Sequence, residues 1–202
     1  MKQYSDIELD ALREFISVGT GHAATALSKL IDKDISVKIP HLNLVPVGEV
    51  PGKLGGPDLA IVGLYFKVYG DIEGSILLFF PQDTANTLLT FLMAGLPRSD
   101  GAEFDEMAQS ALMELGNILA NSYVNALARM MDAQILISVP YFSSDALGAV
   151  VDFLLIEVAQ AGDYALLMDT VIDSTSAELA GNFIIFPDTP SLEKIFRKMG
   201  LR

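Results

Sequence analysis

The stretches ALREFISVGTGHAATALSKLIDKDISVKIP (11–40) and ALMELGNILANSYVNALARMMDAQILISVP (111–140) repeat each other at an offset of 100 residues. The copies differ three residues after a shared glutamate, where the first has Ser17 and the second has Asn117. The repeat predicts a domain of two halves built on one plan, residues 1–100 and 101–202. The shared residues need no gap: Ala11, Leu12, Glu14, Ala26, Leu27, Asp32, Ile35 and Pro40 recur as Ala111, Leu112, Glu114, Ala126, Leu127, Asp132, Ile135 and Pro140.

Hydrophobic periodicity and turn residues predict the same order of elements in both halves. In the first half we expect a helix over 6–31, strands over 35–40, 42–50, 59–70 and 72–81, and a helix over 83–95 capped by Asp83 or Thr84 and ended by Gly95. In the second half we expect a helix over 103–131, strands over 135–140, 147–158, 163–173 and 179–187, and a helix over 190–200. The expected fold class is α/β (α+β), a pseudo-twofold duplicated fold. A mostly antiparallel sheet would pack against long amphipathic helices as a single domain, 1–202.

Two short segments need separate mention. Gly19-Thr20-Gly21 lies inside the first helical pattern, so its glycines indicate helix strain or close packing rather than a phosphate-binding loop. Ser143-Ser144-Asp145 follows Pro140 and is expected to form a polar protrusion.

Composition narrows the classes of function. The chain has 202 residues, 51% hydrophobic and 19% charged, which is typical of a packed globular protein. Its apolar runs are shorter than the roughly 18 residues that span a bilayer, and its acidic start lacks the apolar region of a signal peptide. We therefore expect a cytoplasmic protein.

Charge and residue types exclude further classes. The net charge of −13 disfavours nucleic acid and anionic membranes as partners. The chain has no cysteine, which excludes disulfides and thiolate chemistry. Two histidines, His22 and His41, are too few and too far apart in the sequence for a histidine-rich metal site.

A helical wheel of 103–131 separates a buried stripe from a polar face. The stripe is predicted to contain Ala111, Leu112, Leu115, Ile118, Leu119, Tyr123, Ala126 and Met130. Ser110, Glu114, Asn117, Asn121 and Asn125 fall on the opposite arc and are expected to point to solvent. Glu114 and Asn117 are neighbours at i,i+3. Such a pair is common on solvated helix faces, but asparagine is a poor helix former, so three on one face favour a function without identifying a reaction.

The spacing Ser110-x3-Glu114-x2-Asn117-x22-Pro140 resembles the signature of the CheC/CheX/FliY phosphatases of chemotaxis. The resemblance extends over the whole chain, including GDIEGSILL (70–78) and the closing LEKIFRKMG (192–200). Within that family, the chain length and the two copies are most similar to the CheC type. FliY proteins carry an added flagellar-switch module, so a flagellar motor component is disfavoured.

The resemblance implies a phosphatase whose substrate is the phosphorylated chemotaxis receiver CheY. It implies that Asn117 orients the attacking water and that Glu114 docks against a lysine of the receiver, whereas Ser110 and Pro140 shape the surroundings. No cofactor of its own is implied, because the receiver brings the magnesium ion. CheC-type proteins also bind the receptor deamidase CheD, and Asp145 is a candidate contact.

The first copy reads Asp10-x3-Glu14-x2-Ser17-x22-Pro40 and departs from the signature only at the asparagine. A serine hydroxyl ends nearer the backbone than a carboxamide, so the first site is expected to dock at most through Glu14 and not to catalyse. The alternative function is a non-catalytic regulatory module that binds phosphorylated CheY or CheD. Asn117 favours the enzyme, since binding alone does not require an amide beside the carboxylate.

Overall fold

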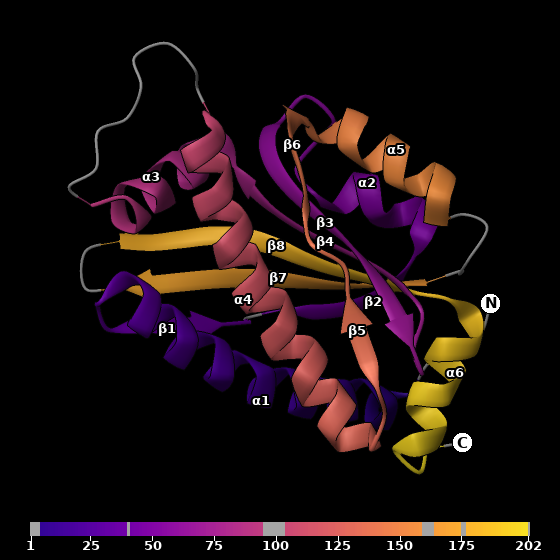
Figure 1. Ribbon diagram of the computed structural model, residues 1–202. Coiled ribbons are helices and arrows are strands. Elements are labelled where there is room, and N and C mark those ends of the chain that lie inside the picture. Colours follow the sequence, from indigo (N-terminus) through magenta and orange to yellow (C-terminus); the bar gives the residue numbers. More distant parts are fainter. Residues whose placement is uncertain (1–4, 40, 95–103, 159–163, 175–176, 202) are drawn as a thin grey trace.

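The computed structural model describes residues 5–39, 41–94, 104–158, 164–174 and 177–201, and it has helices on both faces of one sheet (Figure 1). In chain order the elements are α1 (Asp6–Ile31), β1 (Ile35–Lys38), β2 (Leu42–Pro46), η1 (Val47–Glu49), α2 (Val50–Lys53), β3 (Ala60–Gly70), β4 (Gly74–Pro81), α3 (Gln82–Leu92), α4 (Glu106–Met131), β5 (Ile135–Ile137), β6 (Tyr141–Ala146), α5 (Leu147–Val158), β7 (Tyr164–Ser174), β8 (Ala177–Pro187) and α6 (Thr189–Lys198). Among the helices of these ranges, none has the length and apolar character needed to cross a membrane.

The two long helices, α1 and α4, begin and end at positions related by the 100-residue offset. The side chains of Ser5 and Asp105 cap the two N-termini by accepting hydrogen bonds from backbone N–H groups of the first turn. At the other ends Asp32 and Asp132 adopt left-handed backbone conformations, with φ of 53° and 47°. The repeat therefore conserves the caps of both helices as well as their apolar residues.

One sheet of eight antiparallel strands contains strands from both halves, in the order β1-β7-β8-β4-β3-β5. β2 also pairs with β7, and β6 also pairs with β3. The outer strands of each half are thus hydrogen-bonded to the other half, while β4 and β8 pair at the centre. The expected hairpin of 59–70 and 72–81 is confirmed as β3–β4, and the position of the half boundary near residue 100 lies outside the described residues.

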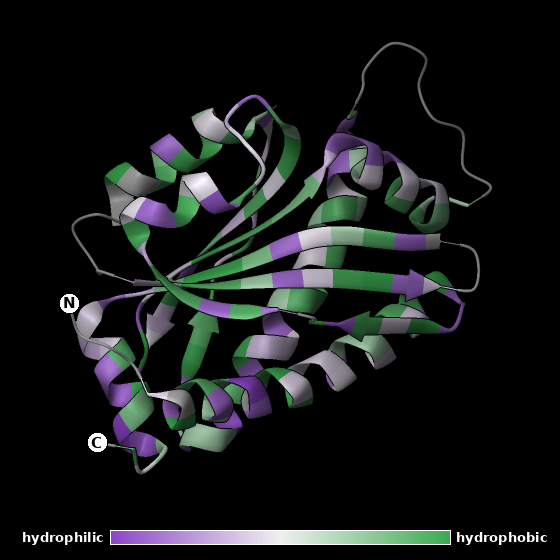
Figure 2. Ribbon diagram, turned by 180° about the vertical axis from the view of Figure 1, so that it is seen from behind, coloured by the Kyte–Doolittle hydropathy of each residue, from purple (hydrophilic) through white to green (hydrophobic). Residues whose placement is uncertain are grey.

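Both faces of the sheet are covered, which makes a three-layer structure. Alternate residues of β4 point to opposite sides: Ile76, Leu78 and Phe80 pack with α1, α4, α3 and α6, whereas Leu77 and Phe79 pack with α2 and α5. Burial on both faces explains the near-continuous apolar run of this strand. Figure 2 shows the central strands largely in the hydrophobic colours.

The helices α1 and α4 cross at Gly19. A Cβ atom at this position would lie 2.6 Å from Cδ1 of Tyr123 and 3.0 Å from its Cα, so only glycine allows this approach. α1 continues through Gly19 and Gly21 without a break. Close packing is therefore the reason for the first of these glycines, whereas an added Cβ at Gly21 would meet nothing within 4 Å.

Two expected strands are wrong in the same way. Residues 147–158 form helix α5, and the strand expected over 42–50 ends at Pro46 and is followed by η1 and α2. The buried residues Leu147, Val150, Val151 and Leu154 have the spacing i, i+3, i+4, i+7 of a helix face. The exposed Phe153 and Ile156 lengthen the apolar run and conceal that period in the sequence.

Smaller corrections concern caps and edges. α3 begins at Gln82, directly after β4, so neither Asp83 nor Thr84 caps it, and Asp83 lies within its first turn. α4 begins at Glu106 rather than at 103, because the Asp105 side chain caps it. Ser143, Ser144 and Asp145 form part of strand β6 instead of a protrusion, because they hydrogen-bond along β3 at the sheet edge. Gly95 and Glu103 lie outside the described residues.

The contact at Gly19 can be tested with a pair of substitutions. Gly19→Ala is expected to lower the free energy of unfolding by about 1–3 kcal/mol, because the backbone of α4 obstructs the new methyl group. Gly21→Ala, two residues along the same helix, is expected to raise it by up to about 1 kcal/mol through helix propensity. Urea unfolding of both variants measures the difference, and equal effects would contradict the close approach.

Candidate active site

Of the five residues that the wheel places on the solvent side of α4, three are exposed and two are half-buried. Ser110, Glu114 and Asn125 are exposed, whereas Asn117 and Asn121 are half-buried. Within the described part of the chain, the Glu114 carboxylate has no hydrogen bond or ion pair. It is therefore free to bind a positively charged group of another molecule.

The opposite side of α4 is packed against the sheet. Leu112, Leu115 and Leu119 of the predicted stripe are fully buried, and Gly116 lies so close to Leu64 that a Cβ atom there would clash. Met130 is a correction: it is 42% exposed, and Met131 is buried in its place. Glu114 and Asn117 thus lie on a helix that is fixed by its packing, because any shift of α4 would disturb the core.

Asn117 and Asn121 form a hydrogen-bonded pair that the sequence analysis missed. Nδ2 of Asn121 donates to the main-chain oxygen of Asn117 at 2.9 Å and to its side-chain Oδ1 at 2.8 Å. The i,i+4 spacing of two asparagines was the available signal. The side chain of Asn125, one turn further, makes no hydrogen bond among the described residues.

The signature proline lies off the helix, in the connection between β5 and β6. Pro140 is half-buried, and the segment before it is held to β3: Ser138 N donates to Lys67 O at 2.9 Å, and Lys67 N donates to Ser138 Oγ at 3.0 Å. The structure therefore places Ser110, Glu114 and Asn117 together on α4, and Pro140 in the short connection between β5 and β6, which both pair with β3.

The first copy presents a different surface. Asp10, Glu14 and Ser17 are exposed on α1, and Pro40 lies outside the described residues. Asp10 forms an ion pair of 2.6 Å with Arg13, whose position in the second copy is held by the uncharged Met113. A cavity of about 380 Å³ adjoins this surface and is lined in part by Arg13, Ser17, Thr20 and Lys38. The first copy thus has ion-paired charges, Arg13 with Asp10 and Lys38 with Asp173, where the second copy has the uncharged Met113 and Ser138.

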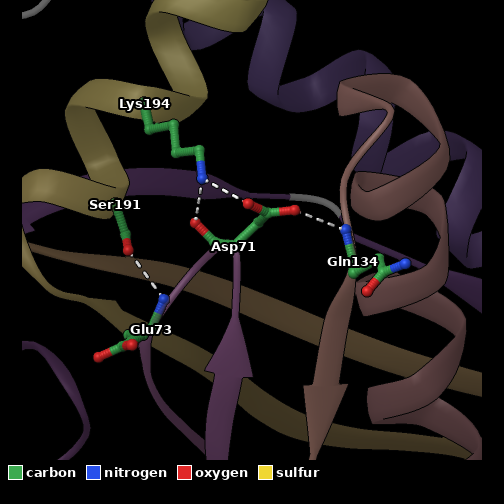
Figure 3. Close-up of polar contacts among 5 residues, drawn as sticks. All are labelled: Asp71, Glu73, Gln134, Ser191 and Lys194. Carbon is green, nitrogen blue, oxygen red and sulfur yellow. Dashed lines mark hydrogen bonds and ion pairs between the residues drawn. The ribbon is translucent and has the colours of Figure 1, made fainter.

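The segment GDIEG (70–74) forms a second polar cluster, at the end of α4 (Figure 3). The Asp71 carboxylate accepts hydrogen bonds from Lys194 Nζ at 2.7 Å and from the backbone N–H of Gln134 at 2.9 Å. The backbone N–H of Glu73 donates to Ser191 Oγ at 2.8 Å. These bonds tie the β3–β4 turn to α6 and to the start of β5, so this part of the resembling sequence is an anchor rather than a reactive site.

The cluster also affects the ionisation of its aspartate. Hydrogen bonds from Lys194 and then from the Gln134 N–H hold the pKa of the Asp71 carboxyl below its ordinary value of 3.8. Gly70 and Gly74 flank the turn with φ of 105° and 151°, values that favour glycine. The glycines thus form the turn that places Asp71 beside Lys194 and Gln134.

Asp145 lies on strand β6, where it borders the α5 side of the sheet rather than the polar face of α4. Its side chain is exposed and accepts a hydrogen bond from the backbone N–H of Ala146 at 2.7 Å. It borders a cavity of about 530 Å³ between the sheet and α5, which Tyr65, Tyr141 and Phe153 also line. In the described residues, no three His, Asp or Glu side chains come together as a metal site.

Comparisons with known proteins agree with this architecture. Residues 107–144, which hold the signature residues of the second copy, match the CheC-like family. The chain is 36% identical over 197 residues to the CheY-P phosphatase CheC of Bacillus subtilis, covering 96% of this chain and 94% of that protein.

Solved structures share the fold. FliY of Thermotoga maritima superposes with a TM-score of 0.80 at 17% identity and covers all of both chains. A chain of the CheX–CheY–BeF3–Mg2+ complex of Borrelia burgdorferi gives 0.52 at 19% identity, over 85% of this chain and 96% of that one. The expected fold class, an antiparallel sheet packed against long helices, is confirmed.

The role of Asp71 can be tested through the pH dependence of stability. Because its folded pKa is lowered, its stabilising contribution is complete above the ordinary value of 3.8 and is lost as the pH falls through the folded value. Asp71→Asn should therefore have a lower Tm than wild type above about pH 5, with a difference that shrinks below 3.8.

Asp58→Asn is the control, since Asp58 is an exposed turn residue without a hydrogen bond or ion pair among the described residues. Circular dichroism melts between about pH 3 and 6 measure all three proteins. A difference between wild type and Asp71→Asn that does not change with pH would contradict the anchor.

Proposed function

The chain belongs to the CheC-like family, and on that premise we propose that it hydrolyses the aspartyl phosphate of the chemotaxis receiver CheY through Glu114 and Asn117. The observation that supports this proposal most directly is the pair itself. An unpartnered carboxylate and a carboxamide lie at i,i+3 on the accessible side of a helix whose other side is buried in the core. Such a pair can be inserted into a partner's site without rearranging the fold.

The two side chains would have separate tasks. Glu114 forms an ion pair with a lysine of the receiver and so positions α4 over the phosphoryl group. Asn117 accepts a hydrogen bond from a water molecule at Oδ1 and holds it in line with the scissile P–O bond, where positioning is the main source of catalysis. The receiver supplies the phosphoryl group and its magnesium ion, so this chain contributes no cofactor.

The first copy is proposed to be inactive. Ser17 has no carboxamide, and its shorter side chain ends close to α1. The surroundings also differ, because an Asp10–Arg13 ion pair lies beside Glu14 where the second copy has the uncharged Ser110 and Met113.

The alternative, a non-catalytic module that binds phosphorylated CheY, would use Glu114 but not the amide of Asn117. Binding of CheD, with Asp145 as a contact, also stays a prediction. The exposed position of Asp145 on the edge strand β6 is compatible with it.

The proposal is tested by following phosphate release from CheY of Bacillus subtilis charged with acetyl phosphate and Mg2+. Wild type should accelerate the release, and Asn117→Ala should lower kcat by about 10²-fold, as expected for removal of a positioned hydrogen-bonding group. Ser17→Ala should match wild type. Loss of activity in Ser17→Ala with retention in Asn117→Ala would place the reaction in the first copy.

Glu114→Gln separates docking from chemistry in the same assay. The substitution keeps the shape and removes the charge, so KM should rise about tenfold while kcat changes little. If wild type fails to accelerate phosphate release, the binding-module alternative replaces the enzyme.

A further inference from the structure

We propose that Asn121 is a positioning residue that holds the Asn117 carboxamide in its working orientation, and that Gly21 at the matching place is a second reason why the first copy is inactive. This inference rests on the proposed function of Asn117. It is carried by the two hydrogen bonds between the asparagines, by the half-buried state of both and by the comparison of the repeats.

The orientation of both amides follows from one atom whose identity is certain. The main-chain oxygen of Asn117 can only accept, so the Asn121 atom 2.9 Å away must be its Nδ2. The same Nδ2 lies 2.8 Å from a side-chain atom of Asn117, which must therefore be an acceptor, Oδ1. A carboxamide can otherwise turn by 180° and exchange its oxygen and nitrogen, and this pair of bonds prevents it.

The two bonds from Asn121, called the clamp below, leave one lone pair of Asn117 Oδ1 free for water. Oδ1 of Asn117 has two lone pairs, of which Asn121 uses one, so the other can accept a hydrogen bond from water. Because the clamp comes from the next turn of the same helix, it is formed before any partner arrives. Ordering the amide in advance reduces the conformational entropy that is lost when water and phosphoryl group are brought together.

The repeat supplies an internal comparison. At the 100-residue offset, Asn117 and Asn121 correspond to Ser17 and Gly21, so the first copy lacks both members of the pair. Gly21 is exposed, has an ordinary helical backbone, and an added Cβ there would meet nothing within 4 Å. Packing does not require this glycine, in contrast to Gly19, and the exposed position has space for the Cβ of an asparagine.

The decisive experiment compares kcat and KM of Asn121→Ala and Asn121→Asp in the CheY phosphate-release assay. Asn121→Ala frees the amide, and kcat should fall about three- to tenfold with KM unchanged, as expected for one lost hydrogen bond. Asn121→Asp has nearly the same shape but can only accept. Its carboxylate loses the bond to the Asn117 main-chain oxygen, which now repels it, and can bind the Asn117 side chain only through Nδ2 of a reversed amide. We therefore expect kcat to fall at least as far as in Asn121→Ala.

Asn125→Ala and Asn125→Asp are the matched controls, since they make the same changes one turn away at an asparagine without a partner in the described residues. Both should keep the wild-type kcat, and Asn125→Asp accounts for the added charge. Circular dichroism checks that all variants keep their helix content. Wild-type kcat in both Asn121 variants, with activity lost in Asn117→Ala, would overturn the positioning role but leave the proposed function intact. Retention of activity in Asn117→Ala would overturn both.

A gain of activity tests the first copy. In an Asn117→Ala background, Ser17→Asn alone should restore little turnover, and Ser17→Asn combined with Gly21→Asn should restore several times more. A double variant that is no faster than Ser17→Asn alone would overturn the assignment of Gly21.

Discussion

The hydrogen bonds that join β1 and β2 to β7, and β5 and β6 to β3, connect the two halves of this protein. Each half places its outer strands on the sheet of the other half, so neither half can complete its sheet alone. The long helices precede these strands in the sequence, and their packing on the sheet is tied to the same pairing. Both helices have the same length and matching caps at the 100-residue offset.

The constraint acts on the inner faces and leaves the outer faces free. Leu12 and Leu112 are both fully buried at equivalent positions, and the caps Asp32 and Asp132 share a left-handed conformation. The solvent side of the same helices has diverged, from Asn117 and Asn121 on α4 to Ser17 and Gly21 on α1. A duplicated fold can thus lose one site without losing stability, because the site makes no contact that the core requires.

The sequence predicted most of this architecture where its signals were local and periodic. The helix over 6–31 and the β3–β4 hairpin agree with the structure, since helix caps, apolar stripes and short turns are encoded by neighbouring residues. It failed over 147–158, where exposed Phe153 and Ile156 hid the helical period of the buried residues. The helical period appears only among the apolar residues that are buried. Which residues are buried depends on how α5 packs on the sheet.

For the candidate site, the sequence by itself determined which residue types are present and their spacing, including Glu114, Asn117 and the departure at Ser17. The sequence also predicts the helix, and helical geometry places Glu114 and Asn117 side by side on one face. Only the tertiary structure decided that the inner side of α4 packs closely on the core at Gly116, and that Asp71 binds Gln134 in the segment between α4 and β5. Only the atomic arrangement revealed the bond from Asn121 to Asn117, because side-chain orientation depends on which lone pairs and N–H groups are within reach, and a residue's place in the sequence does not specify them.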